Sequence, residues 1–399
     1  MKPNTIQIFE HQKLKVNQFD CFTHNHFDLL VIYNEKNKNK YFVVGDKNIV
    51  FNEYVGVIQV AGTTIEILPK ADRENDKAKW QSILLNMLKE CRQIETESIS
   101  TANLKLKSNS LLDLYFELFI KEVEYLIHTG LVKKYRKKSE NLNLLKGQLN
   151  ISKQITKNLI HKELFFTNYN VYDNNHILHK IIYKTLNVID KINNSSYLKD
   201  RLNRLLLDFP QLEDLKVNDK TFESIKLDRK TNHYENAINI AKLILLNYSP
   251  DIISGRDNVL AILFNMNDLW EQFVLNKIKK YAIKNNIKVF GQPAKQFWNY
   301  RLLKPDILLF KDNEKFIIDT KWKNIKNKDV SVNDLRQIFA YNEFWNAKKG
   351  MLLYPDINNL SDFEGEFKNK ENNHFCKVGF IKVEQNNDRF AETIINKII

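Results

Sequence analysis

The spacing of apolar positions changes along the chain, and each change predicts a different kind of element. Short β-rich runs follow one another at Tyr41–Val44, in the stretch up to Val60, and at Thr64–Leu68. Runs of β-branched and aromatic residues bounded by turn formers are typical of strands. From Trp80 the apolar residues recur at intervals of three and four, which predicts a helix with one face toward a core.

Helical spacing then dominates from Leu111 to about Tyr248. The segment Ser249–Gly255 contains a proline and a glycine, which both break helices, and it is the best candidate for a boundary. Beyond it we expect a helix capped by Asn267 and a second helix at Val332–Ala347. Strand-like runs alternate with these helices and predict an α/β core with a mixed sheet: Ile287–Phe290, Leu302–Phe310, Lys315–Lys321, Met351–Tyr354 and Lys377–Val383.

The predicted fold is therefore multidomain. Residues 1–110 form a β-rich N-terminal domain, and residues 111–255 form a mainly helical middle region, so that the first two regions together are α+β. Residues 256–399 form an α/β domain with a mixed central sheet.

Composition narrows the choice of partner. The 399 residues include 61 Lys and Arg against 48 Asp and Glu, a formal charge of +13, which favours a polyanion such as nucleic acid. No signal peptide and no run of ~18 apolar residues is present, so we expect a cytoplasmic protein with no membrane partner. The cysteines are isolated from one another, which argues against disulfides and structural zinc: Cys21, Cys91 and Cys376.

Candidate chemistry lies on two neighbouring strand-like runs. If Asp312-Asn313 is a two-residue hairpin turn, residues whose numbers sum to 625 face each other, and Asp306 then lies opposite Asp319. Lys321 projects from the same face as Asp319 because side chains alternate along a strand. Two carboxylates and an ammonium group therefore converge at one end of the hairpin.

Two carboxylates this close cannot both ionise cheaply, and a hard cation such as Mg²⁺, or Mn²⁺ in its place, removes that cost. The cation activates water toward a phosphodiester, and Lys321 orients or deprotonates that water or stabilises charge on phosphorus. The alternative is a surface hairpin with a cross-strand salt bridge. A D-x-K triplet alone decides nothing, since Asp214-Leu215-Lys216 is another without a hairpin.

Three further residues are candidates for the same site. Glu271, on the helix before the strands, supplies a third carboxylate for the metal, or is an ordinary solvated helix charge. Gln337 and Tyr341 share a helix face because they are four residues apart. They contact DNA phosphate or brace Lys321, or they pack in the ordinary way.

Together, Pro305-Asp306, Asp319-Thr320-Lys321, Glu271 and the Gln337–Tyr341 pair resemble the PD-(D/E)xK nuclease superfamily. The wider chain is similar to the McrC family, the nuclease subunits of McrBC-type systems that restrict DNA carrying modified cytosine. The segments that carry this second likeness lie in all three predicted regions: Gly56–Val60, Ile65–Lys70, Leu142–Gly147, Asp173–His176, Asn265–Val274 and Leu352–Pro355.

The resemblance implies a division of labour. McrC subunits cut double-stranded DNA to leave a 3′-hydroxyl and a 5′-phosphate. They work with a hexameric AAA+ GTPase, McrB, which recognises the modified DNA and whose GTP hydrolysis they stimulate. On this likeness residues 1–110 contact the AAA+ ring. The chain has no Gly-x-x-x-x-Gly-Lys-Ser/Thr loop, so GTP is expected on the partner and no nucleotide on this chain.

Other signals have simpler interpretations. His24-Asn25-His26 lacks the frame of an HNH nuclease, and His176 with His179 lacks a third metal ligand. The basic run Lys133–Lys138 either contacts phosphates or is a solvated loop.

The main hypothesis is a metal-dependent endodeoxyribonuclease. Asp306, Asp319 and Glu271 hold the metal, while Lys321, Gln337 and Tyr341 complete the site. Two alternatives are a non-catalytic DNA-binding adaptor that activates an AAA+ motor, and a nuclease that acts alone.

Overall fold

The computed structural model describes residues 4–70, 76–91, 110–250, 258–325, 329–356, 359–368, 374–384 and 389–399. The chain folds into two compact units, one made of Met1–Ser100 with Ser249–Ile399 and the other of Thr101–Tyr248. The regions predicted as 1–110 and 256–399 thus lie largely in one unit. No helix among the described residues is both long enough and apolar enough to cross a membrane.

The N-terminal part of the first unit contains two sheets and helix α1 (His24–Lys36). In the sequence this helix follows the first two strands and precedes the next four. The larger sheet has the order β1 (Thr5–Phe9), β6 (Thr63–Leu68), β5 (Tyr54–Val60), β11 (Val259–Asn265), with β10 (Tyr248–Ser249) at the edge. The smaller one has the order β2 (Lys13–Lys15), β4 (Asn48–Phe51), β3 (Phe42–Gly45). One apolar core joins them, and Leu14, Leu29 and Phe42 within it are fully buried.

Strand β11 links the N-terminal sheet directly to the C-terminal part. It pairs antiparallel with β5 and runs without a break into helix α10 (Met266–Lys284). The cap of this helix is Asn265, whose side chain accepts hydrogen bonds from the backbone N–H groups of Asn267 and Asp268. The prediction of Asn267 as the cap was wrong by two residues, because the strand extends up to the first turn of the helix. Helix α2 (Lys77–Glu90) packs against α10.

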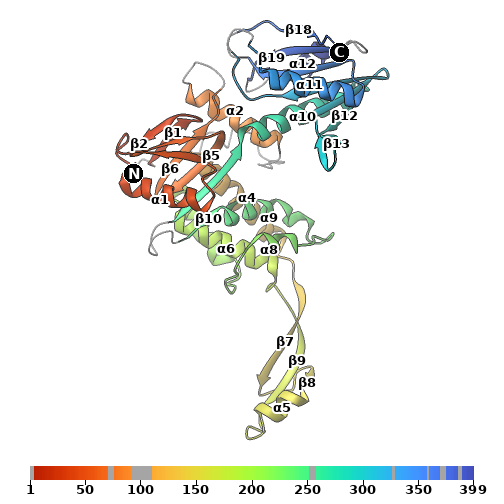
Figure 1. The fold of residues 1–399 in the computed structure, drawn as a ribbon. Helices are drawn as coiled ribbons and strands as arrows, with labels where there is room; N and C mark the ends of the chain where they lie inside the picture. The colour runs from red at the N-terminus through yellow and green to blue at the C-terminus, as the bar shows by residue number, and fades with distance from the viewer. Residues whose placement is uncertain are drawn as a thin grey trace. The chain divides into compact units, whose positions relative to one another are not determined.

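The C-terminal part is a mixed sheet with helices, as the sequence predicts (Figure 1). The sheet has six strands, of which β18 (Phe363–Glu366) was not predicted. Its order is β12 (Lys288–Gly291), β15 (Ile307–Lys311), β16 (Glu314–Thr320), β17 (Lys349–Pro355), β19 (Phe375–Ile381), β18 (Phe363–Glu366). Strands β16, β17 and β19 run parallel, and the remaining pairs are antiparallel. Helix α11 (Val332–Trp345) packs on β16 and β17, and α12 (Phe390–Ile398) packs on β17 and β19.

The run predicted as one strand at Leu302–Phe310 is two strands. Strand β14 (Arg301–Leu303) pairs with β13 (Lys295–Trp298) in a separate hairpin, and β15 begins only at Ile307. Pro305 lies between them. It has no backbone N–H to donate, so a continuous ladder through this point is disfavoured.

The second unit combines helices with a long ribbon. The helices are α4 (Leu111–Thr129), α6 (Ile177–Ile192), α7 (Ser196–Asp208), α8 (Asp219–Glu223), the 3₁₀ turn η1 (Asn232–Tyr234) and α9 (Glu235–Leu246). The ribbon pairs β7 (Lys134–Leu142) with β9 (Phe165–Asp173), and β8 (Gln148–Leu149) and α5 (Ile151–Lys157) lie at its far end (Figure 1).

Of the two interpretations of Lys133–Lys138, the ribbon contradicts the solvated loop, because Lys134–Lys138 lie on β7, and phosphate contact stays a prediction. The strand alternates exposed and half-buried positions but carries mostly charged and polar side chains on both faces. Hydrophobic periodicity, the main sequence signal for a strand, is therefore missing. The strand forms through its complete backbone pairing with β9.

Candidate active site

The hairpin β15–β16 has the register that the sequence predicts. Ile307 faces Ile318, and the pairing continues in step to Lys311 and Glu314. Asp312 and Asn313 form the two-residue turn with φ values of 50° and 64°. Positive φ at both central residues is characteristic of the type I′ turn, whose twist matches that of the strands. The next pair at the open end of the hairpin is Asp306 with Asp319.

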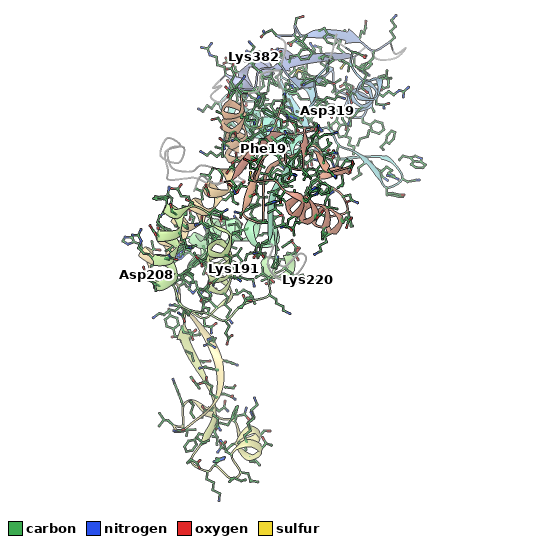
Figure 2. All side chains as sticks on the ribbon, turned by 90° about the vertical axis from the view of Figure 1, so that its left-hand side faces the viewer. Phe19, Lys191, Asp208, Lys220, Asp319 and Lys382 are labelled. Atoms are coloured by element: carbon green, nitrogen blue, oxygen red, sulfur yellow. The ribbon has the colours of Figure 1, made fainter. Side chains whose placement is uncertain are left out.

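Each of these two carboxylates is held differently. Asp306 Oδ2 accepts hydrogen bonds from the backbone N–H of Thr320 at 2.7 Å and from its hydroxyl at 2.9 Å. Asp319, labelled in Figure 2, lies at the end of β16 and is 1% exposed. Its Oδ2 forms an ion pair with Lys321 Nζ at 2.7 Å.

The two carboxylates disfavour each other's ionisation. Burial raises the pKa of Asp319, and the nearby Asp306 raises it further, while Lys321 opposes both effects. Burial also raises the pKa of Asp306 against the two hydrogen bonds from Thr320 and the attraction of Lys321. Without another cation, the pair therefore retains protons more readily than two solvated aspartates do.

Lys321 is fixed by helix α11. Its Nζ donates to Gln337 Oε1 at 3.0 Å, Gln337 Nε2 donates to Tyr341 Oη at 2.8 Å, and the Tyr341 hydroxyl donates to the carbonyl of Lys304 at 2.9 Å. Burial raises the pKa of Tyr341 to about 12, so the phenol remains a neutral donor. Gln337 and Tyr341 thus orient Lys321, which is one of the two functional interpretations that the sequence offers.

The charge of Lys321 also follows from its surroundings. Burial, the largest single effect, lowers the pKa of its ammonium group, but Asp319, Asp334 and Asp306 together raise it by more, and the net shift is upward. Lys321 is therefore a cation in this arrangement. A permanent cation orients water or stabilises developing negative charge more readily than it removes a proton.

Glu271 approaches the pair from helix α10 but is engaged by another residue. Its Oε1 accepts a hydrogen bond from Gln292 Nε2 at 2.6 Å. Burial, followed by repulsion from Asp306, raises the pKa of Glu271 to about 7. The negative charge of Asp306 therefore disfavours the ionisation of Glu271. Across the described ranges, however, no three His, Cys, Asp or Glu side chains are grouped closely enough to hold a metal ion.

The donor set nevertheless fits Mg²⁺. This ion prefers oxygen ligands, keeps several waters, and commonly binds through one or two carboxylates. Asp306 and Asp319 supply two carboxylates, and the pKa of both stays raised even with the Lys321 ammonium group against Asp319. A divalent cation between the two carboxylates would offset the charge that Lys321 leaves uncompensated, with Glu271 as a third ligand once it is released from Gln292.

Sequence reasoning missed a connection between the site and the N-terminal sheet. Glu10, 5% exposed at the end of β1, accepts hydrogen bonds on Oε1 from the backbone N–H of Lys70 at 2.9 Å and from Trp322 Nε1 at 2.8 Å. Trp322 directly follows Lys321, and its ring packs against those of Trp270 and Trp80 at 5.3 and 6.3 Å. No local signal in the sequence joins residues 312 positions apart.

The histidines have structural contacts. His26 Nδ1 accepts a hydrogen bond from the backbone N–H of Thr23 at the start of α1. His179 Nε2 lies 2.9 Å from the Tyr234 hydroxyl, and burial lowers the pKa of His179 to about 4. His176 Nε2 lies 2.8 Å from the carbonyl oxygen of Val132. These contacts agree with the simpler interpretation of both histidine pairs.

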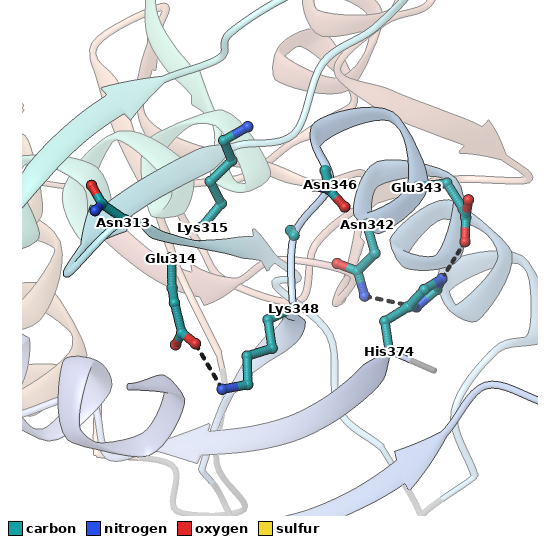
Figure 3. Close-up of a pocket in the computed structure, with 9 residues that line it drawn as sticks. Asn313, Glu314, Lys315, Asn342, Glu343, Asn346, Lys348 and His374 are labelled. Atoms are coloured by element: carbon teal, nitrogen blue, oxygen red, sulfur yellow. Dashed lines mark hydrogen bonds and ion pairs between the residues drawn. The ribbon is translucent and has the colours of Figure 1, made fainter. Parts of the chain in front are cut away.

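A polar pocket lies at the other end of the hairpin (Figure 3). It has a volume of about 370 Å³, and Glu314 and Lys348 on its wall form an ion pair at 2.8 Å. His374 Nε2 lies 2.8 Å from Glu343 Oε1 on the same wall. The proposed catalytic residues do not line this pocket.

Comparisons with known proteins agree with this fold. Residues 49–355, more than half of the chain, match the model of the McrBC 5-methylcytosine restriction system component family. A chain from the refined half-complex of the tetradecameric assembly of Thermococcus gammatolerans McrB AAA+ hexamers with bound McrC superposes with a TM-score of 0.75. That match has 19% identity over 98% of this chain and 99% of the other.

A chain from the cryo-EM structure of the T. gammatolerans McrBC complex gives a TM-score of 0.53, with 19% identity over 72% of this chain and 89% of the other. Among curated proteins, none matches at a significant level. At these identities the structures establish a shared fold. The family match establishes the class, a component of a restriction system. The chain belongs to the McrBC 5-methylcytosine restriction system component family.

Glu10 provides a test of the connection to Trp322. Glu10→Gln keeps an acceptor for Lys70 and Trp322 and removes the ionisable group. Burial raises the pKa of Glu10 from 4.5 to about 7, so its contribution to folding is present below pH 4.5 and is lost as the pH rises toward 7. Between pH 5 and 8 we expect wild type to lose roughly 2 to 3 kcal/mol of unfolding free energy relative to Glu10→Gln.

Urea unfolding followed by tryptophan fluorescence checks this expectation. All five tryptophans lie in the first unit, so the signal reports the unit that contains Glu10. Comparing the two proteins at each pH cancels the titration of other groups, including nearby Glu53 and His11. An identical pH dependence in both proteins would contradict the assignment.

Proposed function

We propose that this chain is the Mg²⁺-dependent endonuclease subunit of a McrBC-type restriction system. This proposal rests on the two carboxylates at the end of one hairpin, Asp319 buried and Asp306 half-buried, with Lys321 held beside them by α11. Holding two ionised carboxylates this close costs free energy, and a bound metal ion would offset that cost. The gathered groups argue against a lapsed site and hence against a purely adaptor role.

The proposed reaction is hydrolysis of a phosphodiester in double-stranded DNA. A divalent cation, Mg²⁺ or Mn²⁺, lowers the pKa of water and neutralises charge on the phosphate when it is bound. Asp306 and Asp319 hold that cation, with Glu271 as a further ligand. Lys321, positioned by Gln337 and Tyr341, orients the attacking water and stabilises the charge that develops on phosphorus.

The products follow from the bonds exchanged. The water oxygen forms a bond to phosphorus as the P–O3′ bond breaks, and the departing oxygen takes up a proton to become a 3′-hydroxyl. The attacking water loses a proton and leaves its oxygen on a 5′-phosphate. The restriction-system context makes DNA with modified cytosine the expected substrate and the cytoplasm the expected compartment.

We also propose that this chain works with a McrB-like AAA+ hexamer that binds GTP and whose GTP hydrolysis it stimulates. The T. gammatolerans assemblies pair McrB hexamers with McrC, which supports this partner. The prediction that residues 1–110 contact the ring stays a prediction. The second unit offers another candidate surface at the far end of its ribbon.

That surface is strongly apolar and exposed. Leu159 and Ile160, between α5 and β9, are 71% and 86% exposed, and no residue of α5 is buried. Neighbouring apolar side chains at the ribbon end are exposed as well: Leu144, Leu145, Ile151 and Ile155. A contiguous apolar patch on a polar surface is typical of a protein-binding site. The ribbon end is therefore proposed to dock on the AAA+ partner.

Catalysis is tested by Asp319→Asn in the chain assembled with its AAA+ partner, GTP and Mg²⁺. Loss of one ligand charge removes several kcal/mol of stabilisation, so cleavage of methylated plasmid should fall by about a hundredfold or more. Asp312→Asn is the matched control, because it changes an aspartate at the turn of the same hairpin to a residue that the turn accepts. Unchanged cleavage by Asp319→Asn would refute the proposed site.

Docking is tested by Leu159→Ser/Ile160→Ser. We expect this protein to lose co-sedimentation with the AAA+ partner and stimulation of GTP hydrolysis, while its unfolding midpoint stays unchanged because both side chains are already exposed. Leu207→Ser, on α7 and 85% exposed, is the control for a loss of surface hydrophobicity elsewhere. Equal binding by all three proteins would exclude the ribbon end as the docking surface.

A further inference from the structure

The hairpin formed by β13, β14 and their flanks, residues 292–304, has a role that the proposed chemistry leaves open. We propose that this aromatic hairpin binds DNA beside the phosphate to be cut. Its aromatic side chains contact the bases, and its cations contact the DNA backbone. This inference rests on the proposed nuclease function. It names the element of the chain that holds the substrate at that site.

Both ends of the aromatic hairpin are attached to the candidate active site. At its start, the Gln292 backbone N–H donates to the carbonyl of Asp306 at 2.9 Å, and the Gln292 side chain donates to Glu271. At its end, the carbonyl of Lys304 accepts the hydrogen bond from Tyr341. The hairpin therefore lies next to the carboxylates at which DNA would be cut.

The base of the hairpin is held against α11. The ring of Phe297 packs edge-on against Phe344 with 5.4 Å between centroids, and Lys295 Nζ donates to the Phe344 carbonyl at 2.5 Å. The same ammonium group lies 5.2 Å from the centre of the Trp345 ring. These contacts fix the base of the hairpin, while its tip projects away from the six-stranded sheet (Figure 1).

The tip presents aromatic side chains to solvent. Trp298 and Tyr300 are 66% and 82% exposed on either side of Asn299, which has a φ of 48°. Leu302 is 52% exposed next to them. Aromatic rings exposed side by side form an apolar surface in contact with water, and a binding partner that covers this surface gains free energy. Such patches therefore mark interaction sites.

The charge of the hairpin identifies the occupant. Residues 292–304 contain three cations, Lys295, Arg301 and Lys304, and no acid. Lys295 is used at the base, but Arg301 and Lys304 are exposed, and neither forms an ion pair among the described residues. Cations next to exposed aromatics are the combination that binds nucleic acid, through phosphate neutralisation and base stacking or wedging.

The experiment measures binding of a fluorescein-labelled DNA duplex by the full-length chain, alone and with its AAA+ partner, with Ca²⁺ in place of Mg²⁺. We expect Trp298→Ala/Tyr300→Ala to raise Kd by about tenfold, since each ring contributes about 1–3 kcal/mol where it stacks on a base, less the cost of unstacking the duplex step that it enters. Arg301→Ala should lower the slope of log Kd against log salt by about one unit. Tyr125→Ala, an exposed tyrosine on α4, is the matched control.

Each outcome is informative. An unchanged Kd in the double variant overturns the inference, and so does an unchanged salt slope in Arg301→Ala. A wild-type dimer that the double variant dissociates, without any change in DNA binding, also overturns it and assigns the tip to a second copy of the chain. Circular dichroism and the unfolding midpoint show whether each variant is folded.

Because binding is measured without cleavage, the two proposals fail separately. Weaker binding by the double variant, in a protein that never cuts DNA, would keep the hairpin assignment and refute the nuclease. Normal binding by that variant, in a protein whose wild type cuts, would keep the nuclease and refute the hairpin assignment.

Discussion

Two carboxylates forced together at the open end of a buried hairpin are the constraint on which the rest of the site depends. The type I′ turn fixes the register, so Asp306 and Asp319 cannot move apart without slipping every apolar residue of the strands to the wrong face. Thr320 and Lys321 compensate part of the charge, but the pKa of both carboxyls remains raised. The remaining cost is most simply removed by a divalent cation, which makes the site a candidate for phosphodiester chemistry.

Much of this hairpin could be predicted from sequence because its determinants are local. A two-residue turn sets the register, alternation sets the face, and helical spacing places Gln337 and Tyr341 together. Contacts between distant segments had no such signal. The hydrogen bond from the Gln292 backbone N–H to the Asp306 carbonyl depends on the β12–β15 pairing. The hydrogen bond from Trp322 to Glu10 depends on the packing of the whole unit. The first strand of the ribbon, β7, was missed because it carries mostly polar side chains on both faces.

The N-terminal sheet is structurally part of the unit that contains the site. Strand β11 pairs with β5 and then becomes the helix that carries Glu271, so the sheet determines where that helix begins. The pairing needs a glycine at position 56, where φ is 134° and a β-carbon would collide with the carbonyl oxygen of Ile262. With the Glu10–Trp322 hydrogen bond, these contacts explain why the chain folds its first and last segments together.

The central claim is that Asp306 and Asp319 share a divalent cation, and anomalous scattering from crystals soaked in Mn²⁺ tests it most directly. We predict an anomalous peak in bonding contact with one oxygen of each carboxylate, at the ~2.0–2.2 Å typical of a small hard cation. The peak should vanish in Asp319→Asn crystals grown in the same way. Well-ordered side chains without a peak at saturating Mn²⁺, or a peak held by other residues, would contradict the claim.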